Sequence, residues 1–389
     1  MLEFHDLPAL HRHLTHGAHL ADAVVVGLDL RAPPPALATT EVRDAVFLGC
    51  ELAADTLASL VGRGALVFPR LGGLPYEAWR TALYTPLELF RGFDAKDPCT
   101  YCATPDARIY EHFKKTGGAS ETSLLEAFAR RLHDHGITEA LEALLTKHPR
   151  VVAFMGGHAM HRDDPAFLRV ARMAAHLSRQ GFLVATGGGP GAMEAANLGA
   201  RFGLVDDARL VAAIDSMQSA PVYSDRDWLA AAFRVRAEHA DVFSDERLTT
   251  LGVPTFFYGH EPPNVFATHH AKYFANCTRE EGLVSLATHG IVFAPGAAGT
   301  VQEIFQDACQ NHYGTVRGEV APMALLDVKF WTEEMPVWPV LQALARRGAW
   351  GDRLLLSDSP DDVVRFLQSV GPRQLNRASW SFCGAFCAK

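Results

Sequence analysis

The second half of the chain alternates short apolar runs with amphipathic helical patterns, and this alternation constrains the fold more than any other sequence feature. Val151–Met155 and Phe182–Thr186 are predicted strands, and each runs into a glycine-rich turn. Asp164-Pro165 between them is typical of a helix start, with apolar residues following at helical spacing. Alternating strands and helices form a parallel sheet with helices on both faces. The predicted fold class is therefore α/β, a doubly wound, Rossmann-like sheet.

The same alternation continues towards the C-terminus. Further strands are expected at Leu210–Ile214, Ile291–Ala294, Met323–Val328 and Leu354–Leu356, and helices at Ala192–Phe202, Val301–Asn311, Val337–Arg346 and Pro360–Ser369. Ligands of such sheets bind beyond the carboxyl ends of the strands, so we expect a site at the glycine-rich turns. An insertion at about 216–260 separates the third and fourth predicted strands. It acts either as a lid over the ligand edge or as an oligomer contact or extra packing layer.

The first third of the chain predicts a smaller α/β unit. Its apolar runs are Ala23–Leu28, Val46–Cys50 and Ala65–Phe68, and we find no internal repeat. Ser123 and Glu126 form a capping-box pattern that opens a helix, and a second helix near Ile137–Lys147 ends before Pro149. We therefore expect an N-terminal accessory domain at 1–148, a Rossmann-like domain at 149–371 and a tail at 372–389.

Charge and hydropathy exclude several classes of partner. The chain of 389 residues carries 36 basic and 44 acidic residues, a net charge of −8, without a basic block. Tight binding to nucleic acid is therefore not expected. The longest apolar runs fall far short of the roughly 20 residues of a membrane span. The N-terminus has no pattern of a secretory signal. We expect a cytoplasmic protein without a membrane partner.

The seven cysteines are an odd number scattered along the chain, which does not indicate a disulfide framework. Cys99 and Cys102 could form a zinc site with Cys383 and Cys387, but the spacing of the second pair favours reduced thiols without a structural role. Five histidines within the first twenty residues fit a polar helix surface or frayed terminus better than a metal tract. We predict no metal site.

Two glycine-rich turns, Gly187–Gly191 and Pro295–Thr300, each join a strand to a helix. Glycine lets backbone amides approach a ligand, and a helix N-terminus favours an anion. Neither turn has the Gly-Lys-Ser/Thr ending of a phosphate-binding loop, and Ala192 interrupts the dinucleotide fingerprint. A purely structural role is the alternative, because α/β proteins need tight turns in any case.

Three strings carry a resemblance to a known family: Val151-Val-Ala-Phe-Met-Gly-Gly-His158, Thr186-Gly-Gly-Gly-Pro-Gly-Ala-Met-Glu194 and Pro295-Gly-Ala-Ala-Gly-Thr-Val-Gln-Glu303. Over roughly 149–371 the chain resembles the Lonely Guy family, above all its long bacterial pyrimidine/purine nucleotide 5′-monophosphate nucleosidases. Glu261-Pro-Pro-Asn264 also fits that branch. The resemblance implies hydrolysis of the N-glycosidic bond of nucleoside 5′-monophosphates to free base and ribose 5-phosphate. It also implies no cofactor and a homodimer or larger oligomer.

The resemblance places the catalytic residues at Glu303 and Arg279, the latter sixteen residues before Pro295. A carboxylate would stabilise the positive charge that develops on the ribose ring. The resemblance places substrate and phosphate binding at Gly157, His158, Gly187, Gly188, Gly189, Gly191, Met193, Glu194, Gly296, Gly299 and Thr300. Ala297 replaces a family glycine. The alternative for Glu303 is a helix N-terminal acid, and the alternative for Arg279 is a solvated helix residue. Glu194 and Met193 either line the pocket or cap and pack their helix. For the whole chain the alternative is a non-catalytic nucleotide-binding sensor.

Overall fold

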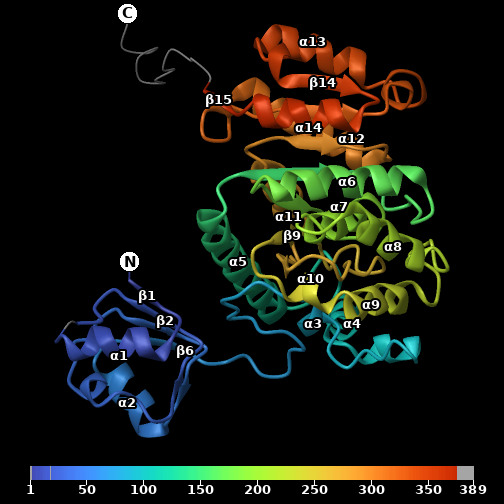
Figure 1. Cartoon of the computed structure of the whole chain (residues 1–389). Helices are drawn as coiled ribbons and strands as arrows, with labels where there is room; N and C mark the ends of the chain where they lie inside the picture. Colours follow the sequence, from blue (N-terminus) through green and yellow to red (C-terminus); the bar gives the residue numbers. More distant parts are fainter. Residues whose placement is uncertain (1, 18, 375–389) are drawn as a thin grey trace, which may run out of the picture.

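The computed structural model describes residues 2–17 and 19–374 of the chain. It confirms the predicted fold class, because its main feature is a seven-stranded sheet in which every strand pairing is parallel. Helix α6 contacts both α7 and α14, and α12 contacts both α11 and α13. Figure 1 shows this large body and a smaller N-terminal part beside it.

The elements of the large body begin soon after the chain leaves the N-terminal part. The strands of the sheet are β7 (Val151–Met155), β8 (Leu183–Thr186), β9 (Thr250–Gly252), β10 (His269–His270), β11 (Ile291–Phe293), β13 (Met323–Leu326) and β14 (Leu354–Ser357). The helices are α5 (Leu124–Lys147), α6 (Pro165–Arg179), α7 (Ala192–Arg201), α8 (Asp207–Met217), α9 (Trp228–Glu238), α10 (Ala240–Ser244), α11 (Asn276–Ser285), α12 (Ala298–Tyr313), α13 (Trp338–Gly348) and α14 (Pro360–Ser369). A short antiparallel pair, β12 (Glu319–Val320) and β15 (Arg373–Gln374), lies outside the sheet.

The strand order places a reversal of winding at the centre of the sheet. The order is β10-β9-β8-β7-β11-β13-β14. The chain winds outward from β7 to β10, returns to β11 on the other side of β7, and winds outward again to β14. The connections after β7 and β11 therefore diverge and leave a crevice beyond the carboxyl ends of these two strands.

The prediction of a third strand at Leu210–Ile214 is wrong. Leu210–Ile214 lies inside helix α8, whose N-cap Asp206 accepts a hydrogen bond from the amide of Arg209. A short apolar run fits a strand or one buried helix face equally well, and here the cap decides for the helix. The strand at this place in the sheet is β9, which comes from the predicted insertion. That segment also supplies α9 and α10, so part of it belongs to the core of the sheet.

The helix before β7 also differs from the prediction. The two helices expected around Ser123 and Ile137–Lys147 are one continuous helix, α5. Ser123 caps it by accepting from the amide of Glu126, as expected. Gly136 lies within α5 and does not break the helix. Its missing side chain lets α5 approach the carbonyl group of Arg80.

The N-terminal part contains a small parallel sheet of order β1-β2-β4-β6 with its own hydrophobic core. Its elements are β1 (Glu3–Phe4), α1 (Leu7–Thr15), β2 (Val24–Val26), β3 (Asp29–Leu30), β4 (Val46–Leu48), β5 (Glu51–Leu52), α2 (Ala54–Gly62) and β6 (Leu66–Phe68). Asp22-Ala-Val and Asp44-Ala-Val open two equivalent turns, with φ +59° at both aspartates. A glycine with positive φ follows strands β2 and β4 alike, at Gly27 and Gly49. The structure thus contains a short repeat that the sequence analysis missed, because only these turn residues recur clearly.

Residues between the two sheets pack partly against the larger core, which includes Leu83, Phe90 and Leu141. Helices α3 (Pro86–Leu89) and α4 (Pro105–Lys115) lie in this stretch. The division of the chain at residue 148 stays a prediction, and this packing favours an earlier boundary.

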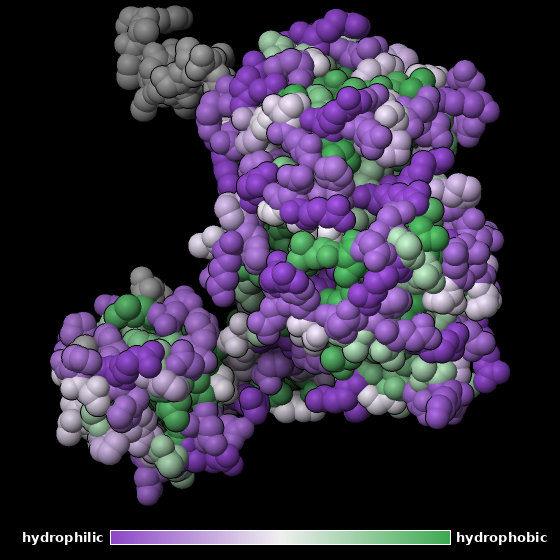
Figure 2. Space-filling model, in the orientation of Figure 1, coloured by the Kyte–Doolittle hydropathy of each residue, from purple (hydrophilic) through white to green (hydrophobic). Residues whose placement is uncertain are grey.

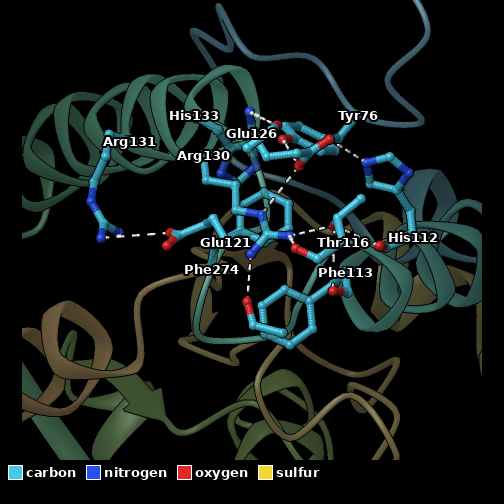
Figure 3. A network of polar contacts seen from close by, with 12 residues as sticks. Tyr76, His112, Phe113, Thr116, Glu121, Glu126, Arg130, Arg131, His133 and Phe274 are labelled. Atoms are coloured by element: carbon cyan, nitrogen blue, oxygen red, sulfur yellow. Dashed lines mark hydrogen bonds and ion pairs between the residues drawn. The ribbon is translucent and has the colours of Figure 1, made fainter.

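A buried polar network fixes α4 and α5 against each other (Figure 3). The Glu126 carboxylate accepts from Tyr76 Oη at 3.2 Å and contacts His112 Nε2 at 2.6 Å and Arg130 Nε at 3.3 Å. Arg130 also donates to the carbonyl oxygen of Gly118 and the hydroxyl of Thr116, both at 2.5 Å. Buried charges need such partners. These contacts therefore hold α4 against α5.

The face of the molecule that Figure 2 shows is largely hydrophilic, with hydrophobic residues in small groups. Across the described ranges, every helix is too short or too polar to cross a membrane.

Gly199 tests the close packing of α6 and α7. A Cβ at this position would overlap the Ala171 carbonyl group, whereas a Cβ at Gly282 in α11 would meet no atom within 4 Å. We expect Gly199→Ala to lower the free energy of unfolding by about 2 kcal/mol or more through overpacking. Gly282→Ala, the matched control, should raise it by about 0.5–1 kcal/mol through helix propensity. Urea denaturation measures both, and equal effects would contradict the packing described.

Candidate functional site

A cavity of about 990 Å³ opens at the carboxyl ends of the parallel strands. Segments following five strands line it: Gly156 and Gly157 after β7, Gly187 after β8, Pro295 and Gly296 after β11, Asp327 after β13 and Asp358 after β14. It therefore lies where the reversal between β7 and β11 predicts a ligand site. Its volume is at the upper end of the range for small-molecule sites.

The N-terminus of α12 faces this cavity without a side-chain cap. Its N-cap residue is Ala297, and Ala298, Gly299 and Thr300 line the cavity. Their amides precede the first intrahelical hydrogen bond, from Val301 to the Ala297 carbonyl, and the contacts of residues 2–17 and 19–374 give them no other acceptor. By contrast, the Asp164 side chain caps α6. The uncapped amides and the helix dipole make this end of α12 suited to an anion.

Arg279 projects from α11 to the edge of the same cavity. Its Nε donates to the carbonyl oxygen of Val253 at 2.9 Å, and its Nη1 donates to Glu280 Oε1 at 2.8 Å. Nη1 lies 3.9 Å from Glu303 Oε1. Gly187 permits this approach, because a Cβ there would overlap Nη2. Nη2 has no hydrogen-bond acceptor in the part of the chain that the structure describes, so it can donate to a ligand.

Glu303 lies in the second turn of α12 and is 8% exposed. Burial raises the pKa of its carboxyl group to about 7, an effect that Arg279 opposes and Glu280 reinforces. One turn further, burial alone raises the pKa of Asp307, whose Oδ2 finds no hydrogen-bond donor among the described residues. A carboxyl group with a pKa near neutral can present a proton to a ligand oxygen as well as accept one.

A buried polar network holds the turn after β8 in place. Asn197 accepts from Thr186 Oγ1 at 2.7 Å and from Asn264 Nδ2 at 2.9 Å. Asn264 also donates through Nδ2 to the Gly189 carbonyl at 3.1 Å. Gly188 has φ +76°, which favours glycine there. Asn197 and Asn264 do not line the cavity, and they hold the turn from its buried side.

The structure brings together most of the predicted site residues, but not all of them. Arg279, Glu303, Gly157, His158, Gly187, Met193, Gly296, Gly299 and Thr300 line the cavity. Gly188, Gly189, Gly191 and Glu194 do not. The first three form the turn behind it, and Gly191, with φ +69°, packs its backbone against Gly157 and His158.

Glu194 points into the core instead. Its carboxylate accepts from Arg162 Nη2 at 2.5 Å and from Nε at 3.1 Å, and both side chains are 0% exposed. Arg162 also donates to the carbonyl oxygens of Ala220 and Trp228. The pair ties α7 to the segment before α9.

Several lining residues were not predicted from the sequence. Tyr258 and Glu261 come from the loop after β9, and Glu261 Oε1 lies 3.5 Å from His158 Nδ1. Arg169 projects from α6, and Asp327 and Asp358 follow β13 and β14. The Glu261-Pro-Pro-Asn264 string was the available signal for the loop. For Asp358 the signal was its position just after the predicted strand Leu354–Leu356. Asp327 gave no such signal, because it lies inside the predicted strand Met323–Val328, whereas β13 ends at Leu326.

The possible metal ligands do not converge. Among residues 2–17 and 19–374, no three His, Cys, Asp or Glu side chains group so as to hold a metal ion. Cys99 and Cys102 are exposed free thiols. Cys383 and Cys387 lie outside the described residues.

Of the three comparisons with known proteins, the one with solved structures finds matches. No protein-family model matches the sequence, and no curated protein matches it either. Among solved structures, the chain is similar to the molybdenum cofactor binding protein of Rippkaea orientalis, with 15% identity and a TM-score of 0.32 over 57% of this chain and 96% of that one. It is also similar to the Moco carrier protein of Chlamydomonas reinhardtii, with 12% identity and a TM-score of 0.34 over 57% and 99%. Likeness at this level carries no argument about a ligand.

These findings correct the sequence analysis. Neither a family model nor a curated protein supports the Lonely Guy family, and the two similar solved structures are molybdenum cofactor proteins and not nucleosidases. The predicted N-glycosidase and its nucleoside monophosphate substrate were therefore wrong, and the alternative nucleotide sensor is not supported. The homo-oligomer, inferred from the same resemblance, loses its support. The physical reason is that glycines at strand–helix turns let the backbone approach an anion. They do not determine which reaction, if any, the protein catalyses.

Glu194→Gln tests whether Glu194 belongs to the core. The change keeps the shape of the side chain but leaves the Arg162 cation buried without a counter-charge, which costs about 3–5 kcal/mol of unfolding free energy. Asp207→Asn, which breaks the exposed pair with Arg172 at 2.6 Å, is the control and should cost about 1 kcal/mol or less. Chemical denaturation distinguishes them. A Glu194→Gln protein as stable as the control variant would show that the pair is not structural.

Glu303→Gln tests the electrostatics of the cavity. A carboxyl group with a pKa of about 7 in the folded state and 4.5 when unfolded binds more protons in the folded state. Its contribution to stability is thus present below pH 4.5 and is lost as the pH rises through 7. Glu303→Gln should therefore gain stability relative to the original protein, by up to about 3 kcal/mol, between pH 4.5 and pH 8. Denaturation at both pH values measures the gain, with exposed Glu281→Gln as control. A pH-independent difference would contradict the burial effect.

Proposed function

We propose that this chain binds, without chemically converting it, an anionic organic molecule of cofactor size at the carboxyl edge of β7 and β11. The observation that carries the proposal is the uncapped N-terminus of α12 facing the 990 Å³ cavity beside Arg279. A helix N-terminus with free amides and an arginine with a free Nη2 supply several donors to one phosphate, carboxylate or similar group.

The rest of the cavity supports an organic body on the ligand. Met155, Met160, Met193, Tyr258 and Phe330 line it. Methionine and aromatic side chains form adaptable, polarisable walls for a ring system. A ligand with an anionic end at α12 and a ring against these side chains would use both kinds of surface.

The roles of individual residues follow from this placement. The amides of Ala298, Gly299 and Thr300 would hold the anionic group, and Arg279 would donate to it through Nη2. Glu303, with a pKa of about 7, would donate its proton to a ligand oxygen when neutral. Gly187 would serve by leaving room for Arg279.

We also propose a cytoplasmic location. The described cysteines at positions 50, 99, 102, 277 and 309 are free thiols, and this supports a reducing compartment.

The experiment is calorimetric titration with a panel of anions: inorganic phosphate and ring-bearing organic phosphates. Ala298→Pro is the decisive variant. Proline is tolerated at the first position of a helix and removes one amide donor, and Ala297 before it is already extended. We expect binding of the anion to weaken about tenfold or more.

Ala54→Pro, at the same position of the uncapped helix α2, is the matched control and should bind normally. Chromatography should recover the bound compound intact. The proposal fails if nothing in the panel binds, if Ala298→Pro binds as well as the original chain, or if the compound is converted.

A further inference from the structure

A second cavity, of about 580 Å³, lies away from the strand ends and has no part in the proposed function. Three segments far apart in the sequence line it: residues 93–114, 223–229 and 259–262. Its volume falls within the range of small-molecule sites.

Aromatic side chains form most of its walls. Phe93, Tyr101, Tyr110, Tyr223 and Trp228 all line the cavity. Four of these side chains are half-buried and Trp228 is buried, so the rings are held by the fold but still border open space.

The walls are anchored from behind. Phe93 packs on Phe233 with ring centroids 5.2 Å apart, and Tyr101 packs on Phe90 at 6.2 Å. The Arg162 guanidinium lies 4.7 Å from the Trp228 ring centroid. Rings fixed in this way keep a slot open for a flat ligand.

Among the described residues, the charged side chains that line the cavity include a cation without a partner, Arg226. Lys114 pairs with Glu111 at 2.8 Å, and Asp225 accepts from the amide of Val222 at 2.8 Å. Arg226 also lines the cavity, and the described residues offer it no hydrogen bond or ion pair. Its guanidinium can therefore bind an anionic group directly.

One loop separates this cavity from the first. Gly259, His260 and Pro262 face the second cavity, while Tyr258 and Glu261 face the first. Gly259 lies directly against the Tyr110 ring, where a Cβ would overlap it. Glu261 Oε1 lies 3.5 Å from His158 Nδ1 on one side and 3.8 Å from His260 Nε2 on the other. A ligand in the second cavity would thus contact the backbone of this loop.

We propose that the second cavity is a binding site for a planar aromatic molecule that carries an anionic group. The ring lies among Tyr101, Tyr110 and Tyr223, and the anionic group meets Arg226. This site is independent of the first cavity and of the function proposed for it.

The test uses three probes of the full chain in calorimetry: naphthalene-2-sulfonate, cyclohexanesulfonate and 2-naphthylmethanol. The first carries both features, the second lacks the aromatic ring and the third lacks the charge. We expect naphthalene-2-sulfonate to bind and each of the others to bind at least about tenfold more weakly, since each loses one kind of contact.

Variants then locate the bound probe. Arg226→Gln should weaken binding of naphthalene-2-sulfonate by about tenfold. Arg234→Gln, which removes an exposed arginine of α9 that does not line the cavity, should leave it unchanged. Hydrogen exchange should slow at residues 257–261 when the probe is bound, because it contacts this loop.

Three results would overturn the proposal. The first is no binding of naphthalene-2-sulfonate at millimolar concentration. The second is equal binding by Arg226→Gln and Arg234→Gln. The third is binding that Ala298→Pro abolishes while Arg226→Gln does not, which would place the probe in the first cavity and leave the function proposed there intact.

Discussion

The reversal of winding between β7 and β11 is the constraint on which the rest of the structure depends. Because all seven strands are parallel, their carboxyl ends meet at one edge, and the connections leaving β7 and β11 diverge at that edge. The divergence creates the cavity, and it also brings the N-termini of α6 and α12 to the same place. The glycines at 157, 187 and 296 allow the backbone segments and Arg279 to approach one another there.

Electrostatics then distinguish the N-terminus of α12 from that of α6, which lies at the same edge. The Asp164 side chain accepts from the Ala166 amide at the start of α6, whereas the side chain of Ala297 leaves the first amides of α12 free. Arg279 adds a cation, and Glu303 is buried deeply enough for its pKa to rise to about 7. The negative charge of Glu303 is thus partly suppressed at neutral pH beside the position proposed for an anion. The arrangement suits binding, and the same features alone do not define a reaction.

Much of the architecture follows from the sequence, but the function does not. Continuous apolar runs such as Val151–Met155 predict buried parallel strands, and glycines after them predict the ligand edge. The strand prediction at Leu210–Ile214 was wrong, because a short apolar run fits one face of a helix as well as a strand. Glu194 looked like a site residue from its position after the glycine turn, but its partner Arg162 lies 32 residues earlier, and only folding brings them together. Likewise, the glycine-rich strings that begin at Gly187 and Pro295 determine the geometry of two turns. Proteins with unrelated activities share this geometry.

The most direct test of the central claim is the position of a bound oxyanion in a crystal soaked with tungstate, a tetrahedral anion that scatters anomalously. The account predicts an anomalous peak from tungsten about 4 Å from the amide nitrogens of residues 298–300, so that the tungstate oxygens lie about 3 Å from these nitrogens and close to Arg279 Nη2. Tungstate bound only at other positions, with this edge of the sheet free of anomalous density, would contradict it.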